Sequence, residues 1–145
     1  MIALIDTNVL VYAFDNSLAA KRQIAQSLLS KALSESGMFC VSIQNLSEFF
    51  AVVTSKIQQP LEKAVAAELV QKLVQFTGIV KIAPRPETVA KAVQFCATQN
   101  ADYWDALLAA TMLEYNIFTV HTENEKDFNK IPGITVINPF NAQPS

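Results

Sequence analysis

Several residue types are scarce in this chain of 145 residues, and their scarcity excludes several classes of site. Only three glycines occur, so neither the G-x-G-x-x-G dinucleotide motif nor a P-loop can be written. The single histidine, His121, argues against His-rich zinc sites and against a Ser-His-Asp triad. The net charge is −2, so the chain lacks the broad basic surface of many nucleic-acid-binding proteins. Contact with nucleic acid would have to be local or aided by a metal.

Signals for export and membrane insertion are also lacking. No run of 18 apolar residues occurs, so we expect no membrane span. The start, MIALID, has no basic segment ahead of a long apolar one, so we expect no signal peptide. Cys40 and Cys96 lie in apolar segments, which favours reduced core residues over a disulfide. These features predict a cytoplasmic protein.

Apolar residues, by contrast, are abundant. They make up 51% of the chain, against 17% charged residues, which predicts one folded domain over residues 1–145. This apolar excess suggests more buried surface than a small monomer needs, as a dimer or partner interface would provide. The surplus in segments 43–57 and 61–76 suits either a dimer face or the docking of a partner helix.

Short apolar runs alternate with longer amphipathic ones along the chain. We predict strands at residues 2–5, 38–42, 79–83, 117–120 and 134–137. We predict helices at residues 19–36, 43–56, 61–76, 86–99 and 103–116, the last apolar on almost every side and therefore central. This alternation predicts an α/β fold with a parallel sheet covered on both faces. Ligands of such sheets bind beyond the carboxyl ends of the strands.

The first candidate site residue is Asp6, which directly follows the predicted strand 2–5. A helix N-cap is an equally good reading, because Asp, Thr and Asn all cap helices well. At a strand end, however, Asp6 would also lie where ligands bind, and Thr7 and Asn8 would orient its carboxylate.

The second candidate is Glu48, in the predicted helix 43–56. The apolar stripe of that helix is predicted to comprise Ile43, Leu46, Phe50, Val53 and Ile57. Glu48 points away from this stripe, as a solvated glutamate would. Its neighbours on that side include Ala51 and Val52, which favours the wall of a cleft.

The third candidate is Asp105, in the first turn of the apolar helix 103–116. Asp102 is a natural N-cap, and Asp105 has the spacing of its partner in a capping box. A buried carboxylate without a partner is costly, however, and a cation is the simplest partner. With no histidine or cysteine available, the three acids predict a hard cation, Mg²⁺ or Mn²⁺, as used in phosphate chemistry.

The segments LIDTNVLVYAFD, SIQNLSEFFAVVT, DYWDALLAATMLEYN, HTENEKDF and INPF resemble the PIN domain, in particular its VapC-like toxin branch. The resemblance runs in order over residues 2–140. It implies a three-layer α/β/α sandwich with a mostly parallel sheet of about five strands. It also implies a Mg²⁺- or Mn²⁺-dependent ribonuclease, an RNA substrate, a cognate antitoxin and a homodimer.

On this resemblance, the first three family acids match Asp6, Glu48 and Asp105. The fourth usually belongs to a threonine–any–aspartate pattern that here starts at Thr122, so Asn124 stands where an aspartate is expected. An asparagine oxygen can bind a hard cation but brings no charge. Asp127 would restore that charge if a helical turn starting at Thr122 pointed it inward.

The remaining charged residues near these motifs have less specific readings. Glu123 and Glu125 are predicted to be solvent-facing or capping acids, and His121 a packing or surface residue. Four basic residues are candidates for contacts with the RNA backbone or are simply solubilising charges: Lys21, Arg22, Lys56 and Arg85.

Three functions are compatible with these features, and a metal-dependent endoribonuclease acting as the toxin of a type II toxin–antitoxin pair is favoured. A phosphotransferase with Asp6 as nucleophile is disfavoured, because Asn8 stands where a second acid is expected. A non-catalytic PIN-like module that binds RNA or protein would explain Asn124. The intact Asp6, Glu48 and Asp105 argue against that module.

Overall fold

Five parallel strands form a single sheet in the computed structural model, which describes residues 1–141. The strands are β1 (Ala3–Ile5), β2 (Phe39–Ser42), β3 (Ile79–Ile82), β4 (Thr119–His121) and β5 (Thr135–Ile137). Their order is β3-β2-β1-β4-β5, and every neighbouring pair is parallel. The predicted parallel sheet of five strands is therefore confirmed.

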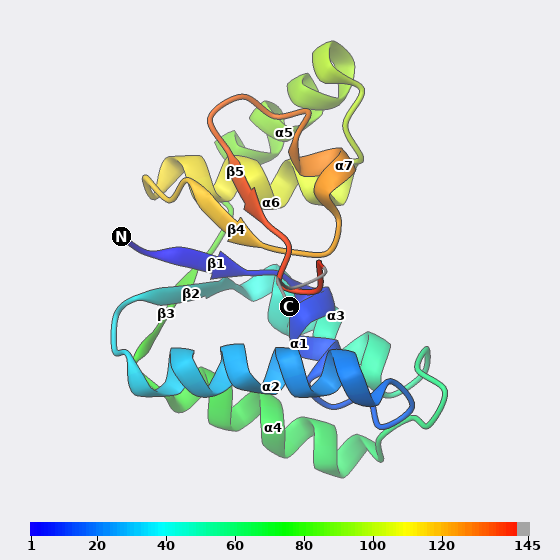
Figure 1. Ribbon diagram of the computed structural model, residues 1–145. Coiled ribbons are helices and arrows are strands. Elements are labelled where there is room, and N and C mark those ends of the chain that lie inside the picture. Colours follow the sequence, from blue (N-terminus) through cyan, green and yellow to red (C-terminus); the bar gives the residue numbers. More distant parts are fainter. Residues whose placement is uncertain (142–145) are drawn as a thin grey trace.

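Helices cover both faces of this sheet (Figure 1). They are α1 (Thr7–Tyr12), α2 (Ala19–Ser34), α3 (Ile43–Val53), α4 (Lys63–Gln75), α5 (Pro86–Gln99), α6 (Tyr103–Glu114) and α7 (Glu125–Phe128). Helices α5 and α6 lie on one face, and α2 and α4 lie on the other. This arrangement confirms the predicted three-layer α/β/α sandwich.

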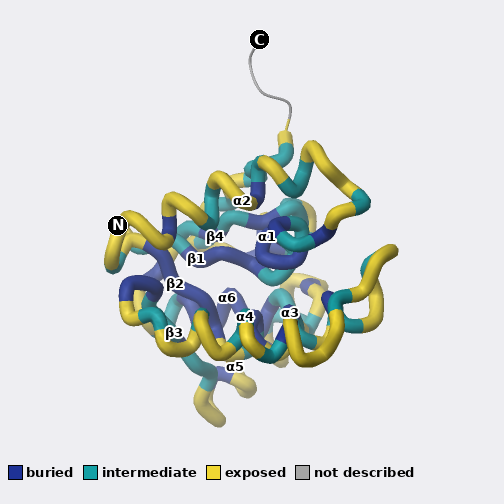
Figure 2. Tube along the Cα trace, turned by 90° about the horizontal axis from the view of Figure 1, so that it is seen from below, coloured by how far each residue is buried: buried dark blue, intermediate teal, exposed yellow. Residues whose placement is uncertain are grey.

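Alternation along the strands divides the core into two clusters, one on each face. Leu4 packs with α6 residues such as Leu108, whereas its neighbour Ile5 packs with Val9 and Phe49 on the other face. Successive side chains of a strand point to opposite faces, so short strands can serve both layers. Figure 2 shows the buried strands between helices whose outer surfaces are exposed.

Helix α6 is as buried as its composition predicts. Every residue from Ala106 to Met112 is buried. Cys40 is buried and Cys96 is half-buried, and both are free thiols, in agreement with the prediction. No helix within residues 1–141 is long and apolar enough to cross a membrane. The predicted single domain extends to residues 142–145, which lie outside the described part of the chain.

The predicted apolar stripe of α3 is wrong in part. Ile43 is 49% exposed, whereas Phe49, which the prediction omits, is completely buried. The buried face runs through Leu46, Phe49 and Val53, an i, i+3, i+7 pattern that places Glu48 at its edge. Ile43 is exposed because it is the first residue of the helix, and the buried residues of α3 begin only at Asn45.

The strand order places the site. From β1 the chain proceeds outward to β2 and β3 on one side and later to β4 and β5 on the other. The order therefore reverses between β1 and β4, which is the crevice where ligands of open α/β sheets bind. The backbone N–H of Asp6 donates to the carbonyl of His121 at 3.0 Å, so the pairing of β1 and β4 continues to this point.

The buried face of α3 gives a test by stability. Phe49→Ala should lower the free energy of unfolding by about 3–5 kcal/mol, because it removes a fully buried ring. Ile43→Ala, on the same helix, should change it by only about 0.5 kcal/mol. Urea unfolding followed by circular dichroism measures both, and equal losses would contradict the observed face.

Candidate active site

Asp6 lies at the carboxyl end of β1 and is the N-cap of α1. Its side chain is only 6% exposed. Oδ1 accepts from the backbone N–H of Thr7 at 2.7 Å, and Oδ2 accepts from the Thr122 hydroxyl at 2.7 Å. The Asn8 amide donates to Oδ2 as well, at 3.3 Å. Asp6 is thus both an N-cap and part of a larger polar network.

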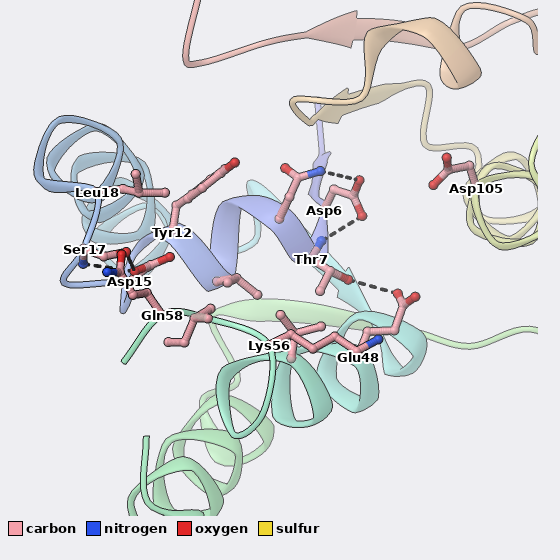
Figure 3. Close-up of a pocket in the computed structure, with 14 residues that line it drawn as sticks. Asp6, Thr7, Tyr12, Asp15, Ser17, Leu18, Glu48, Lys56, Gln58 and Asp105 are labelled. Carbon is pink, nitrogen blue, oxygen red and sulfur yellow. Dashed lines mark hydrogen bonds between the residues drawn. The ribbon is translucent and has the colours of Figure 1, made fainter. Parts of the chain in front are cut away.

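The carboxyl group of Asp6 faces those of Glu48 and Asp105 across a cleft of about 580 Å³. Figure 3 shows the carboxyl groups of Asp6 and Asp105 turned toward each other, with Glu48 below them. No lysine or arginine within residues 1–141 forms an ion pair with any of the three. Three acids that follow β1 or lie on α3 and α6 therefore share one cleft, and no described basic side chain pairs with them.

Burial and mutual repulsion raise the pKa values of two of these acids. Burial raises the pKa of Asp6 to about 6, although hydrogen bonds from Thr122 and Thr7 oppose it. Burial, followed by the charges of Asp6, Asp102 and Asp127, raises the pKa of Asp105 to about 7. The cleft therefore disfavours negative charge unless a cation enters.

Glu48 is half-buried and is held by two neighbours. The Thr7 hydroxyl donates to its Oε1 at 3.0 Å, and the Gln44 amide lies at 3.5 Å from the same atom. Helix α3 begins directly after β2, so its first turns lie at the carboxyl edge of the sheet. This position places Glu48 in the cleft wall.

Asp105 is not the reciprocal partner in a capping box. Asp102 caps α6 alone, because its Oδ2 accepts from the backbone N–H groups of Trp104 and Asp105 at 3.1 and 3.3 Å. The Asp105 carboxylate instead accepts a hydrogen bond from the Asn124 amide at 2.5 Å. This leaves Asp105 with a neutral partner on the cleft side of the helix.

Asn124 connects Asp105 to Asp127. The same amide nitrogen lies 3.3 Å from Asp127 Oδ2, and Lys130 Nζ lies 3.3 Å from Asp127 Oδ1. Asp127 therefore faces the site, but it reaches Asp105 only through Asn124, and Lys130 balances its charge. Asn124 is the nearer of the two candidates for a fourth site residue.

Thr122 joins these groups at the end of β4 and is fully buried. Its hydroxyl donates to Asp6 and accepts from the Asn8 amide at 3.1 Å and from the Asn124 N–H at 3.0 Å. Helix α7 consequently begins at Glu125, not at Thr122 as the capping-box spacing predicts. The Thr122 hydroxyl is occupied by Asp6 and Asn124, and the Glu125 carboxylate accepts from the Asn138 amide at 2.9 Å.

Glu123 is neither solvent-facing nor a capping residue, so that prediction is wrong. Its carboxylate pairs with Lys21 at 2.5 Å and accepts from the Tyr12 hydroxyl at 2.6 Å. Burial raises the pKa of Glu123, but the hydrogen bonds from Lys21 and Tyr12 outweigh it and lower the pKa overall. Its backbone N–H donates to Asn8 Oδ1 at 3.1 Å, so this cluster holds the loop that carries Thr122 and Asn124.

The candidate basic residues lie in different surroundings. Lys21 is committed to Glu123, Arg22 donates to Asn16, and Arg85 contacts acidic residues near the start of α5. Lys56 is the one of the four that lines the cleft, and it forms no ion pair within residues 1–141. His121 packs against the Phe39 ring at 5.8 Å, as predicted for a packing histidine.

Asn45 is a site residue that the sequence analysis missed. It is fully buried. Its Oδ1 accepts from the Ser42 N–H at 2.9 Å, while its amide donates to Thr7 Oγ1 at 3.0 Å and lies 3.4 Å from Asp6 Oδ1. The spacing Ser42-x-x-Asn45 at a strand–helix junction was the available signal, since the pair forms a capping box.

The described residues do not enclose a metal on their own. Within residues 1–141, no group of three or more His, Cys, Asp or Glu side chains is placed so that it could hold a metal ion. The three carboxylates surround an open cleft instead of converging on one point. An ion bound there would keep water in part of its coordination shell, as Mg²⁺ commonly does.

A family model described as PIN domain matches residues 3–134 of the chain. The chain belongs to the PIN domain family. No curated protein sequence matches it. The family match covers strands β1 to β4 and each of the three cleft acids, so the resemblance inferred from short motifs is confirmed over most of the chain.

Solved structures of similar fold include several toxin–antitoxin proteins. A chain of a toxin–antitoxin complex from Klebsiella pneumoniae is 22% identical, with a TM-score of 0.66 over 95% of this chain and 98% of that one. A chain of DNA-bound VapBC from Salmonella typhimurium is 17% identical, with a TM-score of 0.67 over 96% of this chain and 98% of that one. VapC20 from Mycobacterium tuberculosis, a toxin that cleaves the Sarcin-Ricin loop, is 15% identical, with a TM-score of 0.66 over 86% of this chain and 91% of that one. At these identities the similarity establishes the fold of this PIN domain.

The raised pKa of Asp6 predicts that, without metal, the free energy of unfolding of this PIN domain depends on pH. The folded state holds the Asp6 proton up to about pH 6, whereas the ordinary value is 3.8, so stability falls as the pH rises between these values. Asp6→Asn removes this cost. Its free energy of unfolding, relative to that of wild type, should therefore rise by on the order of 2 kcal/mol between pH 4 and pH 7. Urea unfolding in a chelator at several pH values measures the difference; a constant difference would contradict the prediction.

The Lys21–Glu123 pair predicts a second stability effect. Glu123→Gln should lower the free energy of unfolding of this PIN domain by about 0.5–1 kcal/mol, because the pair is part-buried and joins α2 to the 122–124 loop. Glu68→Gln is the matched control, since its pair with Lys72 is exposed on one helix and should contribute almost nothing. A double-mutant cycle with Lys21→Met isolates the pair, and an interaction energy of zero would disprove its role.

Proposed function

We propose that this PIN domain is a metal-dependent endoribonuclease that hydrolyses RNA phosphodiester bonds and is the toxin of a type II toxin–antitoxin pair. Family membership and the similarity to VapC toxins support this assignment. The observation that carries it is the set of three cleft acids, Asp6, Glu48 and Asp105, which face one another with neutral hydrogen-bond partners only.

The chemistry of these residues fits Mg²⁺ or Mn²⁺. The donors are oxygen atoms only, which favours hard cations over zinc or copper. The charges of Asp6, Asp102 and Asp127 contribute to the high pKa of Asp105, so the cleft concentrates negative charge that a divalent cation would neutralise. When bound, such a cation would polarise the scissile phosphate and acidify a water molecule.

The protein's own groups would hold this arrangement in place. Asp6 and Asp105 are the proposed main ligands, oriented by Thr122 and Asn124. Glu48 is the third, oriented by Thr7. Preorganised side chains reduce the cost of assembling a reactive geometry, because their rotamers are fixed before the substrate binds.

Three further groups complete the proposed site. Asn124 contacts Asp105 directly and is a candidate additional ligand through its side-chain oxygen, whereas Asp127 would act through Asn124 or through water. Lys56 is the proposed contact to the RNA backbone, because it lines the same cleft and is unpaired within the described residues.

The proposed partners follow from the similar structures. The Klebsiella pneumoniae structure is a toxin–antitoxin complex, and the Salmonella typhimurium VapBC is bound to DNA. We extend this pairing to the present chain as a cognate antitoxin, together with a homodimer and a cytoplasmic location. Exposed apolar residues such as Val65 and Val74 on α4 supply surface for such contacts.

The activity is tested by replacing Asp6. Asp6→Asn keeps the size of the side chain and an acceptor for the Thr7 N–H but removes its charge, so RNA cleavage with Mg²⁺ or Mn²⁺ should fall by at least about 100-fold. Glu68→Gln is the control, because it removes an exposed carboxylate on α4, outside the cleft.

Binding of Mn²⁺, followed by calorimetry, separates this function from its alternative. Wild type should bind the ion with millimolar or tighter affinity, and Asp6→Asn should bind it more weakly. RNA cleavage that Asp6→Asn leaves unchanged would rule out the proposed site. RNA binding without cleavage would instead identify the non-catalytic module, which the neutral Asn124 beside Asp105 favours.

A further inference from the structure

A second groove of about 460 Å³ lies beside the acidic cleft and shares Glu48 with it. Most of its lining is apolar, from Ile43 on α3 and from Pro84, Trp104 and Leu107. It contains no lysine or arginine. A phosphate bound in this groove would therefore contact no cationic side chain, whereas a flat apolar group would pack against apolar surface.

Trp104 is the largest exposed ring in this groove and the only tryptophan of the chain. It is 57% exposed although it directly precedes Asp105, at the start of α6. The Gln44 amide donates to its carbonyl at 3.0 Å, and the Tyr103 ring packs edge-on at 5.0 Å. The backbone of Trp104 is thus held beside the acids, and much of the residue's surface is uncovered.

Gln44 supplies a polar group at the same place. Its amide nitrogen is used by Trp104 and Glu48, but its Oε1 is buried and has no hydrogen-bond partner among the described residues. Buried acceptors in folded proteins nearly always have a partner, so this oxygen is a place where a water molecule or a ligand donor is expected. The exocyclic amines of adenine, guanine and cytosine are donors of this kind.

We infer that this groove binds a nucleobase of the RNA substrate, stacked on Trp104, while the adjoining phosphate lies in the acidic cleft. This inference rests on the proposed function and adds a base-binding subsite to it. A nucleotide combines a charged phosphate with a flat, largely apolar base, and the two adjacent cavities match these two parts. Aromatic side chains commonly serve as stacking platforms for single-stranded RNA.

The single tryptophan allows a direct test with the intact chain. Adenosine 5′-monophosphate in Mg²⁺ should quench Trp104 fluorescence in a saturable way, because a stacked base contacts the indole. Ribose 5-phosphate, which has the phosphate but no base, should leave the fluorescence unchanged. Equal effects of the two compounds, or none from either, would overturn the inference.

Cleavage kinetics give a second, independent readout. Trp104→Ala should raise KM for single-stranded RNA by about 10-fold with kcat changed less than about 3-fold, as expected for lost stacking. Trp104→Phe should recover most of this loss, since it restores an aromatic face. Phe118→Ala is the control, because Phe118 is 47% exposed but precedes β4, at the opposite edge of the sheet.

The outcomes separate this inference from the proposed function. If Asp6→Asn abolishes cleavage but Trp104→Ala leaves KM unchanged, the ribonuclease stands and the base subsite fails. If RNA is not cleaved but the monophosphate still quenches Trp104 selectively, the subsite stands in a non-catalytic RNA-binding protein. If the fluorescence of Trp104 per molecule changes with the protein concentration but not with added nucleotide, the groove contacts a second copy of the chain and the inference is overturned.

Discussion

The hydrogen bond from the Thr122 hydroxyl to Asp6 joins the ends of β1 and β4 at the point where the strand order reverses. Strand pairing brings the backbones of β1 and β4 together there, and this hydrogen bond orients the carboxylate of Asp6. Through the same hydroxyl, Thr122 also positions Asn8 and the N–H of Asn124, and Asn124 in turn holds Asp105. The orientation of Asp6 and, through Asn124, that of Asp105 thus depend on one buried hydroxyl group.

Such a site is costly for the fold. Burial raises the pKa of Asp6 to about 6 and, with neighbouring acids, that of Asp105 to about 7. Neutral amides and hydroxyls from Asn45, Thr122 and Asn124 reduce this cost without adding positive charge. A cationic side chain in their place would stabilise the acids more, but it would also occupy the space where a metal ion is proposed to bind.

Much of this arrangement could be predicted from local pattern. The alternation of short apolar strands and helices gives the parallel sheet, and Asp6 directly after a strand gives the edge where the site lies. Helical periodicity predicts that Glu48 points away from the core, although the predicted stripe includes Phe50 and omits Phe49, which is fully buried. These features depend on residues a few positions apart, so a sequence displays them.

The remaining features depend on contacts between distant segments. The sequence predicts a solvated or capping acid at Glu123, but its carboxylate pairs with Lys21 and accepts a hydrogen bond from Tyr12, both more than a hundred residues earlier in the chain. Asn45 has an unremarkable local role as a capping residue, and its contact with Asp6 arises only when α3 packs beside α1. The position of Asp127 relative to Asp105 depends on Asn124, whose amide also reaches Asp105 on α6.

The spread of the cleft acids along the chain has a consequence for synthesis on the ribosome. Asp6 emerges first, but its neighbour strand β4 and its partner Thr122 lie near the other end of the sequence. Asp105 likewise acquires its partner only when Asn124 has emerged. A nascent chain therefore carries separate, unpaired acids until the segment with Thr122 and Asn124 has been synthesised, and the cleft is assembled only then.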